Sequence, residues 1–406
     1  MHLSVSESLP LGVWGASGQR PVALAPPSAV LHAVPTSRVH EGTVELAIVI
    51  PTFNEAGNFE ELVRRLDRAL EGINWEAVFV DDDSPDGTAA GLHALSARHP
   101  RIRCLRRIGR RGLSSACVEG MLATGAPWLA VMDADLQHDE ALLPAMLQVM
   151  RQGETDLVVG TRYMAGAGVG DWEPSRQRIS TLATRLSQRL LGLSLRDPMS
   201  GFFMIRRSAF EAAVYRLSSM GFKILVDLVV SSPRPLRVQE LPYRFRDRHA
   251  GQSKLDNRVA WDYLMLLADK TIGRWVPTRL VSFAAVGSIG VLVHLLALCL
   301  LMGLPGNSFV SAQSCAVALA MVGNFMLNNA LTYRDQRLSG WGWWTGLLKF
   351  VAACSVGAAA NVGVASYLHH GSAHWLWSGL AGILVGTVWN YGATAYLVWI
   401  KPKRAA

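Results

Sequence analysis

Two aspartates separated by one small residue, Asp133 and Asp135, directly follow an apolar run that extends from Trp128 to Met132. Residues two apart in an extended chain project to the same side, so both carboxylates are expected to reach one cation, directly or through water. Hard divalent ions such as Mg²⁺ and Mn²⁺ take oxygen ligands and bridge protein carboxylates to phosphates. An isolated Asp-x-Asp is also typical of a solvated turn, but the apolar strand before it and Gln137 after it favour a metal-diphosphate site.

A second acidic cluster, Asp81 to Asp83, is followed by a turn-forming segment. Its carboxylates, Asp81 and Asp82 first among them, can accept hydrogen bonds from a nucleotide base or a ribose. Turn and helix-capping chemistry is the alternative, and it accounts for Asp86, Gly87 and Thr88. The cluster is therefore interpreted as part nucleotide site and part turn.

Short apolar runs alternate with helical segments along the first half of the chain. Runs typical of buried strands occupy 44–51, 75–80, 102–105, 128–132 and 156–160. Helical spacing occupies 58–70, with Leu62, Leu66 and Leu70 on one face, and also 89–97, 113–124, 141–152 and 176–191. This alternation predicts a Rossmann-like α/β domain with a mostly parallel sheet and helices on both faces. Ligands bind at the carboxyl ends of such strands, and the polar clusters fall there: Asn54/Glu55, Asp81/Asp82 and Asp133/Asp135.

The charge of the chain is unevenly distributed. Half of the residues are hydrophobic and 17% are charged, with a formal net charge of +8. Charges are frequent up to Lys270 and rare from Leu280 to Ile400. Because no run of Lys and Arg alternates with aromatic residues, nucleic acid is not an expected partner. The excess of positive charge is interpreted as Lys and Arg residues that flank membrane spans, together with arginines that bind phosphate. Residues 1–43 are rich in Pro, Ser, Ala and Gly, and are predicted to be a disordered extension.

The second half of the chain predicts a four-helix all-α transmembrane domain over 279–406. Its spans are expected at about 280–301, 309–331, 347–367 and 376–400, each near the ~20 residues that cross a bilayer. Residues 256–278 mix Trp and Leu with charges, as in amphipathic helices at a membrane interface. Lys and Arg occur before the first span, between the second and third, and after the fourth. The positive-inside rule then predicts that both termini and the catalytic domain are cytoplasmic.

Polar residues inside the predicted spans can hold helices together or mark the path of a lipid headgroup. Helix packing is the favoured interpretation for these residues, which are His294, Asn324, Asn328, Asn361 and Asn390. Membrane spans beside a diphosphate site imply that one reactant lies in the bilayer.

Several motifs occur together and in order between residues 44 and 255. They are IVIPTFNEAGN (48–58), VDDDSPDGT (80–88), GLSSA (112–116), DADLQ (133–137), GTRY (160–163), DPMSGFFMIR (197–206), GFKIL (221–225) and RHAGQSKL (248–255). This set resembles the polyprenol-phosphate mannose synthase branch of family-2 glycosyltransferases. The tail, with VGSIG (286–290) and NFMLN (324–328), resembles GtrA-like four-helix membrane domains.

The resemblance implies a GT-A fold over 44–255 and an inverting, metal-dependent transfer of one hexose to a polyprenyl phosphate, with mannose from GDP-mannose as the expected donor. It implies that the nucleotide is lined by Pro51, Phe53, Glu55 and Asp82, with Asp81 beside them. It implies that the metal and diphosphate are held by Asp133, Asp135 and Gln137. Basic and hydroxyl groups would gather at the two phosphates: Arg162, Arg176, Ser180, Lys223 and Arg248. Of these residues, a direct catalytic role is expected for Asp135, Arg162, Lys223 and Arg248.

Other interpretations stay open at this point. Arg162, Arg176 and Arg248 can be ordinary surface charges, and Lys223 can be a snorkelling side chain. Asp227 and Gln252 stand where the branch often has glutamate, which leaves the sugar open between mannose and, for example, glucose from UDP-glucose. A processive synthase is disfavoured because 271–275 (TIGRW) lacks the usual glutamine. A lipid flippase or scaffold with an inactive soluble domain is a further alternative. The oligomeric state is left open.

Overall fold

The computed structural model describes residues 43–164, 167–168, 174–218, 221–246, 257–273, 275–306, 308–371 and 374–399. The expected extension over 1–43 lies outside these residues except for its last position, and so do Arg248 and Gln252. For Arg176 the backbone is described within a helix but the side chain is not.

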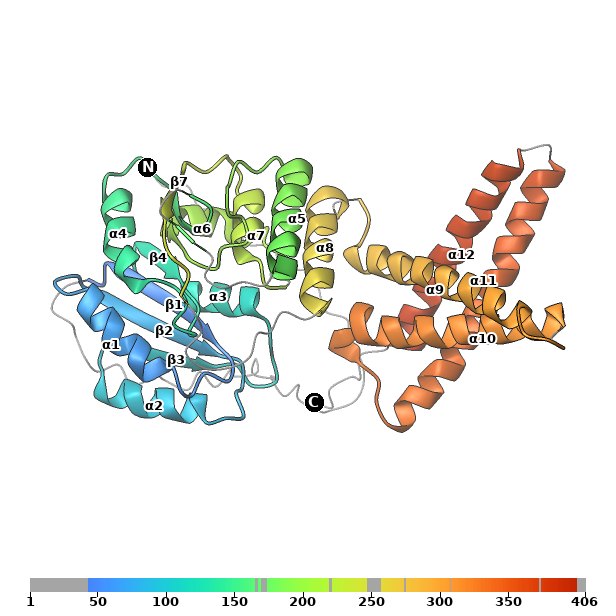
Figure 1. Cartoon of the computed structure of the whole chain (residues 1–406), viewed down its shortest axis with the longest axis horizontal. Coiled ribbons are helices and arrows are strands. Elements are labelled where there is room, and N and C mark those ends of the chain that lie inside the picture. Colours follow the sequence, from blue (N-terminus) through green and yellow to red (C-terminus); the bar gives the residue numbers. More distant parts are fainter. Residues whose placement is uncertain are drawn as a thin grey trace, which may run out of the picture. The chain divides into compact units, whose positions relative to one another are not determined.

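A seven-stranded sheet organises the first half of the chain, in the order β3-β2-β1-β4-β6-β5-β7. Neighbouring strands are parallel except at β6, which runs antiparallel to both β4 and β5. The strands are β1 (Leu46–Thr52), β2 (Trp75–Asp81), β3 (Ile102–Arg106), β4 (Trp128–Val131), β5 (Leu157–Thr161), β6 (Phe203–Arg206) and β7 (Val238–Pro242). The predicted α/β fold with a mostly parallel sheet is therefore confirmed (Figure 1).

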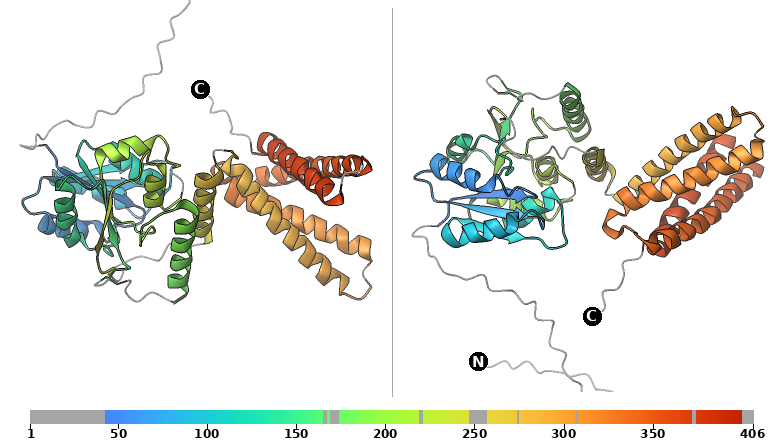
Figure 2. Two further views of the ribbon diagram at one scale, coloured as in Figure 1. Left: turned by 90° about the horizontal axis from the view of Figure 1, so that it is seen from above. Right: turned by 60° about the horizontal axis from the view of Figure 1, so that its bottom comes forward.

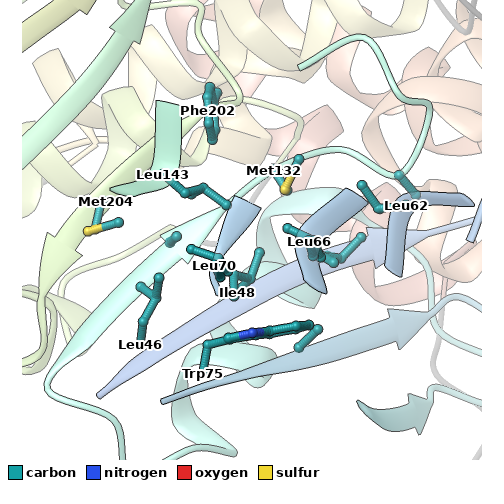
Figure 3. Close-up of a cluster of buried hydrophobic side chains, with 14 of the residues drawn as sticks. Leu46, Ile48, Leu62, Leu66, Leu70, Trp75, Met132, Leu143, Phe202 and Met204 are labelled. Carbon is teal, nitrogen blue, oxygen red and sulfur yellow. The ribbon is translucent and has the colours of Figure 1, made fainter. Parts of the chain in front are cut away.

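Helices cover the sheet and bury its apolar residues. They are α1 (Phe59–Ala69), α2 (Thr88–Arg98), α3 (Leu113–Leu122), η1 (Glu140–Leu142), α4 (Leu143–Arg151), α5 (Pro174–Leu191), α6 (Arg207–Val214) and α7 (Ile224–Ser231). One core contains α1 and α4, and a second contains α3, α6 and α7. The predicted face of α1 is confirmed, because Leu62, Leu66 and Leu70 are fully buried against strands β1 and β2 (Figure 3).

The register of the central strands brings the predicted ligand loops to one edge of the sheet. Thr52, the last residue of β1, pairs with Asp81, the last residue of β2. Strand β4 lies on the other side of β1 and ends beside Val49. Consequently the segments that follow β1, β2 and β4 all leave the sheet at its carboxyl edge, where a ligand of an α/β domain is expected.

Asp156 fastens the opposite end of β5. Its buried carboxylate accepts hydrogen bonds from the Arg237 guanidinium at 3.0 and 3.1 Å, from the Arg237 backbone N–H at 3.1 Å, and from Arg234 at 3.2 Å. The Arg237 side-chain hydrogen bond is the main reason that the pKa of Asp156 lies well below its usual value. The strands β5 and β7 are thus joined by charge as well as by their backbone ladder.

The lowered pKa of Asp156 predicts an acid sensitivity that one substitution reduces. A depressed folded-state pKa stabilises the protein above the unfolded carboxyl pKa of about 3.9, and that stabilisation is lost as the pH falls below it. Asp156→Asn should lower the unfolding midpoint at pH 7 and make it fall less steeply than the wild type below about pH 4. Thermal unfolding of both proteins between pH 7 and pH 3 checks this, and parallel pH profiles would contradict it.

The second half of the chain is helical. Its elements are α8 (Asn257–Ile272), α9 (Thr278–Met302), α10 (Phe309–Leu327), the π-helical turn η2 (Asn328–Thr332), η3 (Arg334–Gln336), α11 (Trp341–His370) and α12 (Trp375–Leu397). Within the described part of the chain, three stretches are long and apolar enough to cross a membrane: Thr278–Met302, Ser311–Thr332 and Trp341–Leu368. Helix α12, with 23 residues, occupies the place of the fourth expected span. The number of spans stays a prediction.

Candidate active site

The loop after β4 presents the two aspartates at the carboxyl edge of the sheet. The side chain of Asp133 is 37% exposed, whereas Asp135 is buried and its carboxylate accepts a 3.2 Å hydrogen bond from the backbone N–H of Gln137. Leu136, directly after Asp135, has φ of +64°, a left-handed conformation that is rare for a branched residue. Such strain persists only where the surroundings enforce it and is concentrated at functional sites. The loop therefore turns sharply between Asp135 and Gln137, both of which are predicted to face a ligand.

His138 holds this loop through a hydrogen bond to its backbone. The Asp133 backbone N–H donates to His138 Nδ1 at 3.0 Å, so the ring proton sits on Nε2, which is 3.8 Å from the Asp133 carboxylate. The ring stacks on Phe202 with 5.1 Å between centroids, and Phe245 meets it edge-on. Burial lowers the pKa of His138 below its usual value and keeps the ring neutral. A neutral ring can support the loop without cancelling the charge of the aspartates.

Gln137 is held by the segment after β7. Its side-chain amide donates to the Arg246 carbonyl at 3.0 Å, and its own carbonyl accepts from the Arg246 N–H at 2.9 Å. The Arg246 guanidinium in turn donates to Asp139 and Glu140, both at 2.6 Å. Because the Gln137 amide nitrogen is engaged with the backbone, its Oε1 atom is directed away from that contact. Arg246 is thus a positioning residue that the sequence analysis missed.

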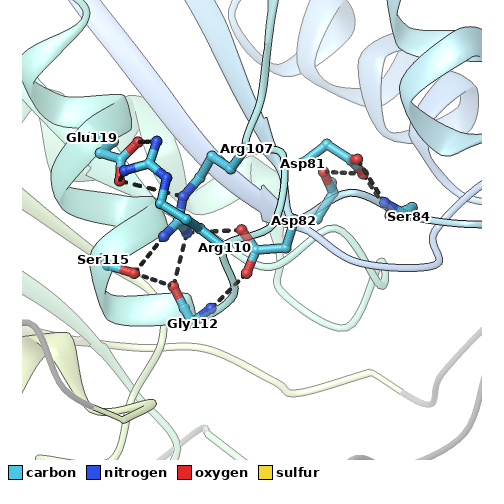
Figure 4. A network of polar contacts seen from close by, with 9 residues as sticks. Asp81, Asp82, Ser84, Arg107, Arg110, Gly112, Ser115 and Glu119 are labelled. Carbon is cyan, nitrogen blue, oxygen red and sulfur yellow. Dashed lines mark hydrogen bonds and ion pairs between the residues drawn. The ribbon is translucent and has the colours of Figure 1, made fainter. Parts of the chain in front are cut away.

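The acidic cluster after β2 is divided between two roles (Figure 4). Asp81 is fully buried and accepts from the Ser84 N–H at 2.9 Å and the Ser84 hydroxyl at 2.6 Å. Asp82 accepts from Arg107 at 2.7 Å and from the Gly112 N–H at 2.7 Å. Burial raises the pKa of Asp82, and the hydrogen bonds from Gly112 and Arg107 reduce that increase. Asp81 therefore shapes the turn, while Asp82 ties it to the loop before α3.

The turn interpretation of Asp86 and Thr88 is confirmed. Asp86 accepts from the Thr88 N–H at 3.0 Å and the Thr88 hydroxyl at 2.6 Å, and its other oxygen accepts from the Ala56 N–H at 3.1 Å. Thr88 also accepts from the Glu55 N–H at 3.0 Å. These bonds join the loop after β1 to the loop after β2, and the two loops together form one wall of the site.

The predicted nucleotide-lining residues of the β1 loop lie on that wall. Pro51 belongs to β1 itself, and the Glu55 carboxylate accepts from Asn58 at 2.8 Å. The guanidinium of Arg111 lies 4.4 Å from the centre of the Phe53 ring. An aromatic face and a cation together suit a stacked base and its phosphates, and the sequence analysis did not single out Arg111.

Arg162 forms a buried, bidentate ion pair with Asp197. Its Nε and one terminal nitrogen donate to the two Asp197 oxygens at 2.7 and 2.8 Å, and its backbone N–H adds a third bond at 3.2 Å. Asp197 is fully buried, and the guanidinium also lies 5.5 Å from the Phe245 ring centre. Hydrogen bonds to Asp197 oppose desolvation and raise the pKa of Arg162, so its charge is permanent. The surface-charge interpretation of Arg162 is therefore wrong.

The other predicted phosphate ligands are placed in part. The Ser180 hydroxyl is 3.0 Å from the Tyr163 hydroxyl, next in sequence to Arg162. The Lys223 ammonium donates to the Met199 carbonyl at 3.4 Å, in the same loop as Asp197. The structure thus brings Ser180 and Lys223 to the surroundings of the Arg162–Asp197 pair. The contributions of Arg176 and Arg248 stay predictions.

The acidic and basic groups meet around the aromatic cluster of His138, Phe202, Tyr243 and Phe245. His138 Nε2 lies 3.8 Å from the Asp133 carboxylate, and its ring centre lies 5.7 Å from that of Phe245. The Arg162 guanidinium lies 5.5 Å from the same Phe245 ring centre. The aspartate loop after β4 and the Arg162–Asp197 pair therefore lie on one aromatic cluster.

The residues present fit a divalent cation that is shared with a substrate. Asp133 and Asp135 supply two hard oxygen donors on one loop, and Gln137 supplies an amide. Among the described residues no group of three or more His, Cys, Asp and Glu side chains forms a metal cage. Mg²⁺ and Mn²⁺ are commonly held by one or two carboxylates with substrate phosphates and water completing the shell. The pair suits that shared mode of binding.

Asp227 forms a buried ion pair with Lys270. It is one of the two residues that depart from the expected motif. It accepts from Lys270 of α8 at 2.6 Å and from the hydroxyls of Ser218 and Ser231 at 2.8 and 3.1 Å. Lys270 also donates to Ser231 at 2.8 Å. The pair joins helix α7, which begins directly after Lys223, to helix α8.

The Asp227–Lys270 pair predicts an asymmetric mutational result. Asp227→Ala leaves the buried Lys270 ammonium with only the more distant Asp269 carboxylate, at 3.9 Å, and should cost about 3 kcal/mol, whereas the double variant Asp227→Ala/Lys270→Met should recover part of that loss. Chemical or thermal unfolding in detergent measures the difference. A double variant less stable than Asp227→Ala alone would contradict the assignment.

Comparison with known proteins gives the family. Residues 47–213 match the family model for glycosyl transferase family 2, and residues 282–399 match the GtrA/DPMS transmembrane domain. A dolichol-phosphate mannosyltransferase of Pyrococcus furiosus is 34% identical over 360 residues, covering 88% of this chain and 99% of that protein. This chain belongs to the family-2 glycosyltransferases. Within the family it is similar to the dolichol-phosphate mannosyltransferases, and the predicted resemblance is confirmed.

Further comparisons cover less of this glycosyltransferase. The dolichol-phosphate mannosyltransferase of Saccharomyces cerevisiae is 32% identical over 256 residues, which are 61% of this chain and 94% of that protein. Among solved structures, glucosyl-3-phosphoglycerate synthase from Mycobacterium tuberculosis in complex with phosphoglyceric acid aligns with a TM-score of 0.43 and 18% identity, over 56% of this chain and 80% of that one.

Proposed function

We propose that this glycosyltransferase moves one mannosyl group from GDP-mannose to a polyprenyl phosphate, with inversion, at the cytoplasmic face of a membrane. The observation that carries the proposal is that the loop of Asp133, through His138, and the buried Arg162 fork both contact Phe245 in one aromatic cluster. The same chain continues into helices long and apolar enough to span a bilayer. The names of its full-length relatives support the sugar and the lipid.

Transfer of a sugar to a phosphate needs little acid–base catalysis. A non-bridging oxygen of the acceptor phosphate attacks the anomeric carbon of the sugar while the bond from that carbon to the diphosphate oxygen breaks. The leaving diphosphate takes the electron pair. Because the nucleophile is already an anion, positive charge and positioning supply most of the rate. Lys223, whose ammonium donates to the Met199 carbonyl, matches this need, and the Arg162–Asp197 pair lies in the same loop region.

The donor is assigned to the side of the site built from the loops after β1, β2 and β4. Phe53 and Arg111 would take the base and a phosphate, and Asp82 would fix the loop that carries Arg111. A Mg²⁺ or Mn²⁺ ion held by Asp133, Asp135 and Gln137 would neutralise charge on the leaving diphosphate. The acceptor phosphate is assigned to the side of Arg162, Ser180 and Lys223.

One assay separates the candidate activities. Purified protein is incubated with polyprenyl phosphate in mixed micelles, with radiolabelled GDP-mannose or UDP-glucose, and with Mn²⁺, Mg²⁺ or EDTA. Labelled lipid from GDP-mannose that disappears with EDTA is the expected result. Labelled lipid from UDP-glucose but not from GDP-mannose would show that the transferred sugar is glucose and not mannose. No lipid product from either donor would favour a scaffold or a flippase.

The membrane orientation needs its own measurement. Single cysteines introduced at Ser339 and at Ser308, in a background lacking the native cysteines, are labelled by an impermeant reagent in sealed inside-out vesicles. Ser339 lies in the basic loop before α11 and Ser308 in the loop before α10. Labelling of Ser339→Cys and protection of Ser308→Cys is expected, and the reverse pattern would place the catalytic domain outside.

A further inference from the structure

The membrane helices carry a sequence repeat. Thr278–Gly290 at the start of α9 matches Thr345–Gly357 in α11 at six of thirteen positions, including one phenylalanine, one serine and the final glycine. Asn324–Tyr333, from the end of α10, likewise aligns with Asn390–Trp399, from the end of α12. Each of these segments starts with an asparagine followed by an aromatic residue, and each closes on an aromatic residue. The α9–α10 and α11–α12 hairpins therefore share one pattern.

The matching residues make the same contact inside each hairpin. A Cβ atom on Gly290 would overlap the amide of Asn324, and a Cβ atom on Gly357 would overlap the amide of Asn390. The Oδ1 atoms of both asparagines are buried, and neither accepts a hydrogen bond from any described residue. Small residues allow such close helix approach in membranes. The same glycine–asparagine contact thus joins the two helices of each hairpin.

The contacts between the hairpins are reciprocal. Phe283 of α9 meets Tyr391 of α12 with 5.9 Å between ring centroids, and the equivalent Phe350 of α11 meets Phe325 of α10 at 5.7 Å. Exchange of the two hairpins converts the first pair into the second. An interface in which residue i contacts j and its equivalent contacts the equivalent of j is isologous and has two-fold symmetry.

Two equivalent residues also lie where the axis must pass. On a two-fold axis a residue contacts its own counterpart. Tyr333 and Trp399 occupy the same position of the repeat, and their rings are stacked 4.1 Å apart with an interplanar angle of 4°. The helix pairs obey the same exchange, because α10 contacts α11 and α12 contacts α9. Figure 2 shows the two hairpins as separate helix pairs.

We infer that the membrane domain is an intramolecular dimer: two copies of one helical hairpin dock through a self-complementary surface, with a pseudo-two-fold axis through the Tyr333–Trp399 stack. The occupant of the docking surface of each hairpin is the other hairpin of the same chain. Since Tyr333 and Trp399, which close the two hairpins, stack on each other, both hairpins end at the same end of the bundle. The repeat is therefore parallel and its axis lies along the membrane normal. The inference stands apart from the proposed sugar and donor.

The copies differ where the first one meets the catalytic half. Arg334, directly after Tyr333, pairs with Asp262 of α8, and Asp335 pairs with Arg279 at 2.6 Å. The positions equivalent to Arg334 and Arg279 are Ile400 and Gly346. The first hairpin is therefore the copy adapted to hold α8, and the second serves as its structural partner.

Two double-mutant cycles in the full-length protein test the symmetry. The first combines Phe283→Ala with Tyr391→Ala, and the second combines Phe350→Ala with Phe325→Ala. Thermal unfolding in detergent, followed by the monodisperse fraction, gives the shift in midpoint for each variant. We expect each single substitution to lower the midpoint by several degrees, and each double variant to lose less than the sum of its singles.

Lipid-facing positions of the repeat provide the matched control. Ile289 and Val356 are equivalent and are 37% and 51% exposed, so Ile289→Ala and Val356→Ala should leave the midpoint almost unchanged. Where an alanine variant fails to fold, Phe283→Leu and Phe350→Leu replace it in the cycle. Additive losses in either cycle, or coupling of Phe283 to Phe325 instead of Tyr391, would overturn the two-fold arrangement.

Discussion

Replacement of Asp135 by asparagine should reduce kcat by at least about a thousand-fold while leaving the fold intact. Asparagine keeps the size of the side chain and an oxygen for the Gln137 N–H, but it removes one of the two charges that would hold the cation. A bound metal supplies several kcal/mol of charge stabilisation, and every 1.36 kcal/mol is about tenfold in rate. Initial rates at saturating donor and acceptor, together with the thermal unfolding midpoint, measure both parts of the prediction.

Asp83→Asn is the matched control for this variant. Asp83 also follows a strand at the carboxyl edge of the sheet, but it pairs with Arg106 at the surface at 2.6 Å. Its replacement should change kcat by less than about threefold, as expected for an exposed ion pair. Wild-type kcat in Asp135→Asn at saturating Mn²⁺, or an equal loss in both variants, would remove the metal assignment.

Arg162→Ala should lower kcat/KM for the lipid acceptor by about 30-fold or more, which corresponds to about 2 kcal/mol for a lost charge-assisted contact. The same substitution leaves Asp197 buried without its counter-charge and should lower the unfolding midpoint. Arg162→Lys keeps the charge but cannot reproduce the bidentate geometry. We therefore expect the lysine variant to recover more stability than activity.

A surface fork provides the comparison for Arg162. Arg151 binds Glu45 through two bonds of 2.7 and 2.8 Å, with similar geometry, next to the start of β1 and away from the carboxyl edge. Arg151→Ala should leave acceptor kinetics unchanged. If Arg162→Ala lowered the unfolding midpoint but left kcat/KM for the acceptor unchanged, the fork would be a structural brace with no part in phosphate handling.

The sequence was most informative where chemistry and periodicity coincide. The apolar spacing of Leu62, Leu66 and Leu70 predicted a buried helix face, and the acidic clusters predicted the ligand edge, because parallel strands place their ends together. Both features depend on near neighbours in sequence. The antiparallel strand β6 was missed, since Phe203–Arg206 is only four residues long and its partners β4 and β5 are distant in the chain.

The polar partners were harder to predict. Asp197 lies 35 residues after Arg162, and Arg246 lies 109 residues after Gln137. Ion pairs over such distances leave no periodic signal, although the aspartate at the start of the DPMSG motif was visible. The membrane repeat did leave a signal, the shared spacing of Phe283, Ser288 and Gly290 with Phe350, Ser355 and Gly357. It was overlooked because general hydrophobicity dominates such helices.

Helix α8 is fastened on both sides, by Lys270 to Asp227 and by Asp262 to Arg334. The Lys270–Asp227 pair is buried, whereas the Arg334 side chain is 49% exposed. Salt screens exposed ion pairs more strongly than buried ones, so the contact of α8 with η3 should weaken before its contact with α7 as the ionic strength rises.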